Sequence, residues 1–135
     1  MKDQLKDITI LVIDDDHDTL ELLRTLLEGY GATVVTADSV ESALPAWRHA
    51  PPHIVLTDMR LGTSDGFALL EAIRNYNNEY RGFTPAIALT GYWPAGDEAR
   101  AMSAGFNAYL RKPVDPANLV DTITFVLRNP ADFAA

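Results

Sequence analysis

The sequence predicts a single α/β domain in which helices cover both faces of a five-stranded parallel sheet. Short apolar runs alternate five times with segments of helical spacing, and such alternation implies a parallel sheet. The apolar runs are rich in β-branched residues, as in strands buried on both faces. Right-handed crossovers between such strands favour a doubly wound arrangement. The 135 residues fit one compact domain, residues 1–135, which we expect to have its core at about 8–128 and a short tail at 129–135.

The first two strand–helix units occupy the N-terminal third of the chain. Residues 8–13 (ITILVI) form a β-branched apolar run that predicts the first strand. Asp18, with a glutamate three positions later, is typical of a helix N-terminus, and leucines at helical spacing follow it. Residues 33–37 (TVVTA) predict the second strand. Asp38 repeats the capping pattern before a helix that we expect to end at about His49, ahead of two prolines.

The third unit lies in the middle of the chain. Residues 54–57 (IVLT) predict the third strand, and Asp58 follows it directly. A loop at 62–66 has a glycine at each end and leads to a helix that we expect at about 67–76. Residues 77–84 are polar and predict no regular structure.

The last two units complete the predicted sheet. Residues 86–90 (AIALT) predict the fourth strand, and residues 96–104 predict a helix that ends at a glycine. A short fifth strand is expected at 108–110 (AYL). Asp115 is the expected N-cap of the final helix, because a proline occupies the first helical position after it. The predicted buried stripe of this helix consists of Leu119, Ile123, Val126 and Leu127.

Composition and charge exclude several classes of protein. The formal net charge is −8, whereas a surface that binds a nucleic acid duplex is normally basic, so we expect no direct nucleic-acid binding. The acidity can also serve solubility alone. Without cysteine the chain has no disulfide or thiolate metal site, and its three histidines lack metal-ligand spacing. Since no apolar run approaches the roughly 18 residues of a membrane span, we expect a cytoplasmic protein with no membrane contact.

Polar residues follow the predicted strands at the points where these strands end. Asp14 and Asp15 come after the first strand, Asp58 after the third, Thr90 ends the fourth, and Lys112 follows the fifth. In doubly wound folds the functional site lies at the carboxyl ends of the strands. We therefore expect three carboxylates, a hydroxyl and an ammonium to meet at one edge of the sheet.

The chemistry of this set favours phosphoryl transfer. Three neighbouring carboxylates repel one another and raise each other's pKa, and Mg²⁺ with its oxygen ligands would relieve that repulsion. Lys112 offers a point charge suited to phosphate, and carboxylates are known nucleophiles that become aspartyl phosphates. Each residue alone has an ordinary reading, such as acids at a helix N-terminus or a strand that ends in a turn. Their joint occurrence at the strand ends favours a site.

Four segments of the sequence carry a family resemblance. They are ILVIDDDHDTLELL, HIVLTDMRLGTSDGFALL, PAIALTGY and AGFNAYLRKPVDPANL, and they are spread along residues 8–127, so the resemblance extends over nearly the whole chain. With these segments the chain resembles the receiver domains of response regulators in two-component signalling, a CheY-like family. The resemblance implies a flavodoxin-like (βα)5 fold with strand order 2-1-3-4-5. It also implies a phosphoacceptor that switches a protein-interaction surface, with only self-phosphorylation and slow autodephosphorylation as its chemistry.

The resemblance implies a role for the acidic residues one by one. Asp58 matches the phosphoacceptor. Asp14 and Asp15 match the acidic pair that organises Mg²⁺, and Asp58 joins them as a ligand. The backbone carbonyl of Arg60 matches the main-chain ligand of the metal.

Four further positions match residues that contact the phosphoryl group or respond to it. Thr90 matches the hydroxyl and Lys112 the ammonium that contact its oxygens, and Pro113 matches the usual cis-peptide partner of that lysine. Tyr109 matches the aromatic switch residue, which turns inward as Thr90 moves. The implied phosphodonor is a sensor histidine kinase or a phosphotransfer protein. The implied output is a downstream partner, or a second copy in a homodimer, at the surface of the fourth helix, fifth strand and fifth helix.

The sequence departs from the family pattern at three places. Gly62 stands where the loop after the phosphoacceptor usually has proline, so we expect a more mobile loop. Gly91 follows Thr90 where alanine is commoner, which should ease access to the phosphoryl site. The bulky run at 92–94 (YWP) either packs on the fourth helix or contacts a partner.

Three alternatives stay open at the level of the sequence. Because the chain ends soon after the last helix, we expect a regulator without its own output domain, and the alternative is the receiver module of a hybrid histidine kinase or larger regulator. A phosphohydrolase of the haloacid dehalogenase type needs a DxD pattern at its nucleophile, and Arg60 breaks it after Asp58. That pattern does occur at 14–16, in a chain with little room for a substrate cap. A degenerate receiver that binds partners without phosphorylation is disfavoured by the complete residue set.

Overall fold

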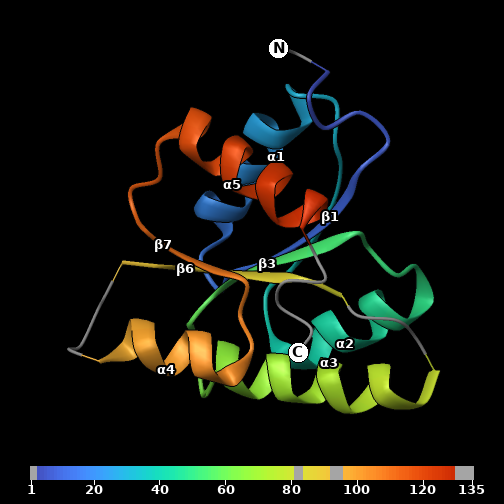
Figure 1. The fold of residues 1–135 in the computed structure, drawn as a ribbon, viewed down its shortest axis with the longest axis vertical. Helices are drawn as coiled ribbons and strands as arrows, with labels where there is room; N and C mark the ends of the chain where they lie inside the picture. Colours follow the sequence, from blue (N-terminus) through green and yellow to red (C-terminus); the bar gives the residue numbers. More distant parts are fainter. Residues whose placement is uncertain (1–2, 81–83, 92–95, 130–135) are drawn as a thin grey trace.

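A parallel five-stranded sheet forms the centre of the molecule (Figure 1). The computed structural model describes residues 3–80, 84–91 and 96–129. The sheet order is β2-β1-β3-β6-β7, and because β6 and β7 are its fourth and fifth strands along the chain, the predicted order 2-1-3-4-5 is confirmed. The strands are β1 (Thr9–Ile13), β2 (Thr33–Ala37), β3 (Ile54–Asp58), β6 (Ala86–Thr90) and β7 (Ala108–Arg111).

Helices lie on both faces of this sheet, as expected for a doubly wound fold (Figure 1). One face is covered by α1 (His17–Glu28) and α5 (Pro116–Arg128). The other face is covered by α2 (Val40–His49), α3 (Gly66–Tyr80) and α4 (Asp97–Ala104). Within the described ranges no helix is both long enough and apolar enough to cross a membrane.

The central strand β1 supplies side chains to both apolar layers. Ile10 and Val12 belong to the cluster under α1 and α5, whereas Leu11 and Ile13 belong to the cluster over α2, α3 and α4. All four side chains are at most 1% exposed. A continuous apolar run is therefore the correct pattern for this strand, since both of its faces are buried.

Two helices begin at other residues than the sequence suggested. Asp16, not Asp18, caps α1, because its carboxylate accepts hydrogen bonds from the backbone N–H of Asp18 and the hydroxyl of Thr19. Ser39, not Asp38, caps α2 in a reciprocal capping box with a serine three positions later. In both cases neighbouring residues are all good caps, and the backbone conformation selects one of them.

The region after β3 is more regular than expected. The predicted loop contains a small hairpin of β4 (Arg60–Leu61) and β5 (Ser64–Asp65). Helix α3 then runs on to Tyr80, so the expectation of irregular structure from residue 77 was wrong for residues 77–80. This segment is polar but contains neither proline nor glycine, so the helix can continue through it.

Candidate functional site

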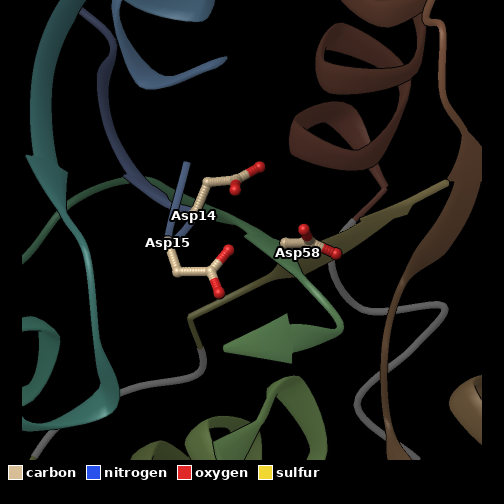
Figure 2. A group of neighbouring side chains, drawn as sticks. All are labelled: Asp14, Asp15 and Asp58. Carbon is tan, nitrogen blue, oxygen red and sulfur yellow. The ribbon is translucent and has the colours of Figure 1, made fainter. Parts of the chain in front are cut away.

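Three carboxylates meet at the carboxyl ends of β1 and β3 (Figure 2). Asp14 and Asp15 follow β1, and Asp58 is the last residue of β3. One oxygen of each lies within 4.8 Å of one oxygen of the others. Asp14 is buried, Asp58 is half-buried and Asp15 is exposed, so the cluster opens to solvent on one side. A set of carboxylate oxygens at this spacing fits a hard divalent cation.

Lys112 connects two of the three carboxylates. Its ammonium Nζ lies 2.6 Å from Oδ2 of Asp14 and 3.2 Å from Oδ2 of Asp58. The lysine stands directly after β7, where its backbone N–H donates to the carbonyl of Thr90 at 2.9 Å. The peptide bond from Lys112 to Pro113 is cis, as the resemblance implied.

Burial and charge act in opposite directions on the pKa values of Asp14 and Lys112. Burial raises the pKa of Asp14, although hydrogen bonds from Lys112 and from the N–H of Asp16 oppose the rise. Burial alone would lower the pKa of Lys112, but its hydrogen bond to Asp14 and the charges of Asp14 and Asp58 outweigh burial, so the pKa of Lys112 is raised. Lys112 therefore stays an ammonium at neutral pH and offers a fixed positive charge to the cluster.

Backbone N–H groups contact each of the three carboxylates. The N–H of Asp16 donates to Asp14 at 2.9 Å. The hairpin after β3 supplies the other two, from Arg60 to Asp58 at 3.3 Å and from Gly62 to Asp15 at 3.1 Å. The sequence reasoning missed the role of Gly62, although its departure from the family's usual proline was a signal that the main chain is used there.

An open cavity of about 460 Å³ lies over these groups. Its lining residues are Asp14, Asp15, Asp16, Asp58, Arg60, Thr90, Gly91 and Lys112. Thr90 is fully buried at the end of β6, and Gly91 beside it is exposed. A Cβ at Gly91 would have its nearest neighbour at 4.0 Å, so crowding does not require glycine there. The cavity therefore brings together six residues predicted for the site, whereas Pro113 and Tyr109 are not among its lining residues.

Tyr109 lies away from that cavity, on β7. Its ring packs in the apolar layer between the sheet and α2, α3 and α4, and its hydroxyl oxygen is shielded from solvent. Burial raises the pKa of this hydroxyl, and the charges of Asp97 and Glu98 on α4 add to the rise. The charges in the first turn of α4 therefore act on this side chain. The aromatic run at 92–94 lies outside the described residues.

The family model of the response regulator receiver domain matches residues 10–124 of the chain. An uncharacterized 14.6 kDa protein in the sodA1 3'region of Leptolyngbya boryana is 40% identical over 130 residues, which are 95% of this chain and 97% of that protein. The sensor histidine kinase GacS of Pseudomonas protegens is 33% identical over 84% of this chain and 12% of the kinase. The transcriptional regulatory protein ZraR of Escherichia coli K12 is 35% identical over 86% of this chain and 25% of that protein.

Solved structures agree with these matches. A response regulator receiver domain protein from Clostridium thermocellum superposes with a TM-score of 0.82 at 30% identity, over 92% of this chain and 97% of that one. The receiver domain of NtrX from Brucella abortus superposes with a TM-score of 0.80 at 29% identity, over 89% of this chain and 98% of that one. Since the family model matches residues 10–124, which are most of the sequence, the chain belongs to the response regulator receiver domain family.

Proposed function

We propose that Asp58 is the residue of this receiver that accepts a phosphoryl group from the phosphohistidine of a sensor kinase or phosphotransfer protein. The proposal rests on the family and on the geometry of the cavity. The half-buried Asp58 carboxylate lines this open cavity, through which a donor would reach it. The match over residues 10–124 supports treating residues 8–128 as the receiver core.

The position of Lys112 is the observation that carries this assignment. Its ammonium contacts Asp58 and Asp14 at once, so a fixed cation stands beside the proposed acceptor. Oxygens of a phosphoryl group on Asp58 would meet the same ammonium, which suits phosphate as a point charge. A lysine that served only as a structural partner of Asp14 would have no need to reach Asp58 as well.

A divalent cation is part of the proposal, and Mg²⁺ is the natural choice for an all-oxygen site. Asp14, Asp15 and Asp58 would hold it together with the backbone carbonyl of Arg60, a residue of the cavity lining. When bound, the ion neutralises charge on the transferring phosphoryl group. The fit of the three carboxylates to one cation supports this assignment.

The transfer itself needs little covalent chemistry from the protein. An oxygen of Asp58 forms a bond to phosphorus while the bond from phosphorus to the donor imidazole nitrogen breaks, and the nitrogen keeps the electron pair. Lys112 and the hydroxyl of Thr90 donate to the phosphoryl oxygens. Water later hydrolyses the acyl phosphate and restores the carboxylate, so the signal is transient.

Phosphorylation would change a surface remote from Asp58. A phosphoryl group adds about −1.5 to −2 charge units, which attracts Thr90 and Lys112. Movement of Thr90 would let the ring of Tyr109 turn further inward, and the surface of α4, β7 and α5 would change with it. A partner that prefers the changed surface, or a second copy of the chain, completes the shift in population.

The protein context of this receiver has two readings. It acts either as a stand-alone regulator or as the receiver module of a hybrid histidine kinase or larger regulator. A sensor histidine kinase and a transcriptional regulator are both among its relatives, and the chain spans 12% and 25% of their lengths.

A haloacid-dehalogenase-like phosphohydrolase is the rival function, and two observations disfavour it. That chemistry needs a second carboxylate two positions after the nucleophile, and Arg60 occupies this position after Asp58. After Asp14 the position is Asp16, but its carboxylate caps α1 through Asp18 and Thr19. An aspartate engaged as a helix cap is poorly placed to act as a general acid.

Incubation with acetyl phosphate and Mg²⁺ tests the proposed function. Intact-protein mass spectrometry should detect one added phosphoryl group on the wild type and none on Asp58→Asn. Asp121→Asn, an exposed aspartate of α5, is the matched control and should label like the wild type. The proposal fails if the wild type stays unlabelled or if Asp58→Asn labels equally. Steady turnover of a small phosphate ester would favour the hydrolase instead.

A further inference from the structure

The hairpin after β3 turns two main-chain donors toward the acidic cluster. The N–H of Arg60 donates to Oδ1 of Asp58 at 3.3 Å, and the N–H of Gly62 donates to Oδ2 of Asp15 at 3.1 Å. Alternate residues of an extended segment direct their N–H groups to the same side, so one short stretch serves both carboxylates. The contact of Gly62 joins residues 47 positions apart and ties the hairpin to the loop after β1.

The contact depends on the backbone of Gly62. This residue follows β4 in the two-residue connection to β5 and has a positive φ of 65°. No atom lies within 4 Å of the place where a Cβ would be, so glycine is favoured by conformation and not by crowding. Proline, usual here in the family that the sequence resembles, has no N–H and holds φ near −65°. A chain with proline at this position therefore cannot make the contact.

Asp15 needs such an anchor more than its neighbours do. Lys112 contacts Asp14 and Asp58, whereas Asp15 is exposed and receives its hydrogen bond from the hairpin. A carboxylate has two acceptor oxygens, so the hydrogen bond at Oδ2 of Asp15 leaves its Oδ1 available to a cation. A charge-assisted hydrogen bond also limits the rotation of the side chain into water.

We propose that Gly62 is a positioning residue of the metal site, whose N–H holds the Asp15 carboxylate in place beside Asp14 and Asp58. The inference deepens the proposed function and rests on it, because it takes the acidic cluster as the Mg²⁺ site. Hydrogen bonds to metal ligands typically change metal affinity by about 10- to 100-fold. At this exposed ligand we expect the lower end, roughly a tenfold loss of Mg²⁺ affinity without the donor.

The test is a calorimetric titration of Mg²⁺ without any phosphoryl donor. An amide-to-ester replacement at Gly62 removes the N–H and keeps the chain free to adopt positive φ. Gly62→Pro also removes the donor, and Gly62→Ala is its control, because alanine suffers strain at positive φ but retains the N–H. The ester and Gly62→Pro should bind Mg²⁺ about tenfold more weakly than the wild type. Gly62→Ala should stay close to the wild type.

Urea unfolding without metal shows whether each variant is folded, and the outcomes separate the two proposals. If the ester binds Mg²⁺ as tightly as the wild type, or if Gly62→Ala loses as much affinity as Gly62→Pro, the positioning role is wrong and the phosphoacceptor role stands. If the wild type itself binds no Mg²⁺ at millimolar concentration, both fall together.

Discussion

The negative charge of the acidic cluster is offset both by a side chain and by backbone N–H groups. Lys112 donates to Asp14 and Asp58, and a backbone N–H donates to each of the three carboxylates. Main-chain donors add no net charge and do not leave the site, so they reduce repulsion without filling the place of a cation. These donors therefore leave room for the proposed cation among the three carboxylates.

The exposed pair of His17 and Asp38, outside the cluster, gives the fold a pH-dependent contribution that can be tested. The hydrogen bond from His17 lowers the pKa of Asp38, against a smaller opposing effect of burial, and the hydroxyl of Ser42 lowers it further. A carboxyl whose pKa is lower in the folded state stabilises the fold above its ordinary pKa. That contribution is lost as the pH falls through the folded-state pKa.

We expect His17→Ala to raise the pKa of Asp38 toward its ordinary value, because the main cause of the shift is removed. A carbon-detected NMR titration of the Asp38 carboxyl group measures this. Ser42→Ala should give a smaller rise in the same direction. An unchanged Asp38 pKa in His17→Ala would show that the pair does not form in solution.

The side chains of the site could be predicted from the sequence, and the main-chain contacts could not. Asp14, Asp58 and Lys112 are found from strand ends alone, because parallel topology gathers those ends at one edge. The donors Arg60 and Gly62 depend on the hairpin, which apolar periodicity does not reveal in a segment this short. A backbone N–H is present at nearly every position, so only geometry selects the useful ones.

The elements themselves were predicted well in kind and less well at their ends. Strands β2 and β6 have the predicted bounds, whereas the caps of α1 and α2 lie at Asp16 and Ser39. Helix α2 also continues through Pro45, a residue that normally breaks a helix. The buried Ala43 and Trp47 on either side of the proline fix this helix on the sheet, so tertiary packing overrides the local preference.

The N-cap of α5 is a capping contact that the sequence did predict, and it gives a prediction for one element. Asp115 accepts a hydrogen bond from the N–H of Asn118 at 3.0 Å. Asp115→Ala should lower the free energy of unfolding by about 1 kcal/mol, since an orphan donor at the helix end loses its partner. Urea unfolding measures the difference.

Asp121→Ala is the matched control for that experiment. It removes the same charge from an exposed position within α5, away from the capping contact. The capping interpretation requires Asp115→Ala to be clearly more destabilising than Asp121→Ala. Equal effects would mean that net charge, and not the cap, is responsible.

At the scale of the whole molecule, strand register brings the site together. Ile13 of β1 pairs with Thr57 of β3, so the next residues, Asp14 and Asp58, stand at the same level. Thr90 of β6 pairs with Arg111 of β7, directly before Lys112. Lys112, which contacts the acidic cluster, thus directly follows the strand that carries Tyr109. The ring of Tyr109 packs against the apolar layer to which α4 contributes Ala101.

If the proposed switch acts through Thr90 and Tyr109, phosphorylation should alter residues far from the cavity as well as those around it. Beryllofluoride with Mg²⁺ should shift backbone amide NMR signals of α4, β7 and α5 in the wild type as well as those around the cavity. Thr90→Val keeps a similar shape but lacks the hydroxyl, so in this variant the shifts should stay near Asp58. If the wild-type shifts are also confined to the cavity, the proposed switch is wrong.

The alternation of side chains along β1 also limits how this chain can vary in length. Successive side chains of β1 point alternately into the two apolar layers. The loss or gain of one residue between Thr9 and Ile13 would therefore turn each following or preceding side chain toward the opposite layer. The same slip would move Asp14 off the level of Asp58. We therefore expect β1 to tolerate exchanges among apolar side chains at residues 10–13, but no change in the spacing between these core residues and Asp14.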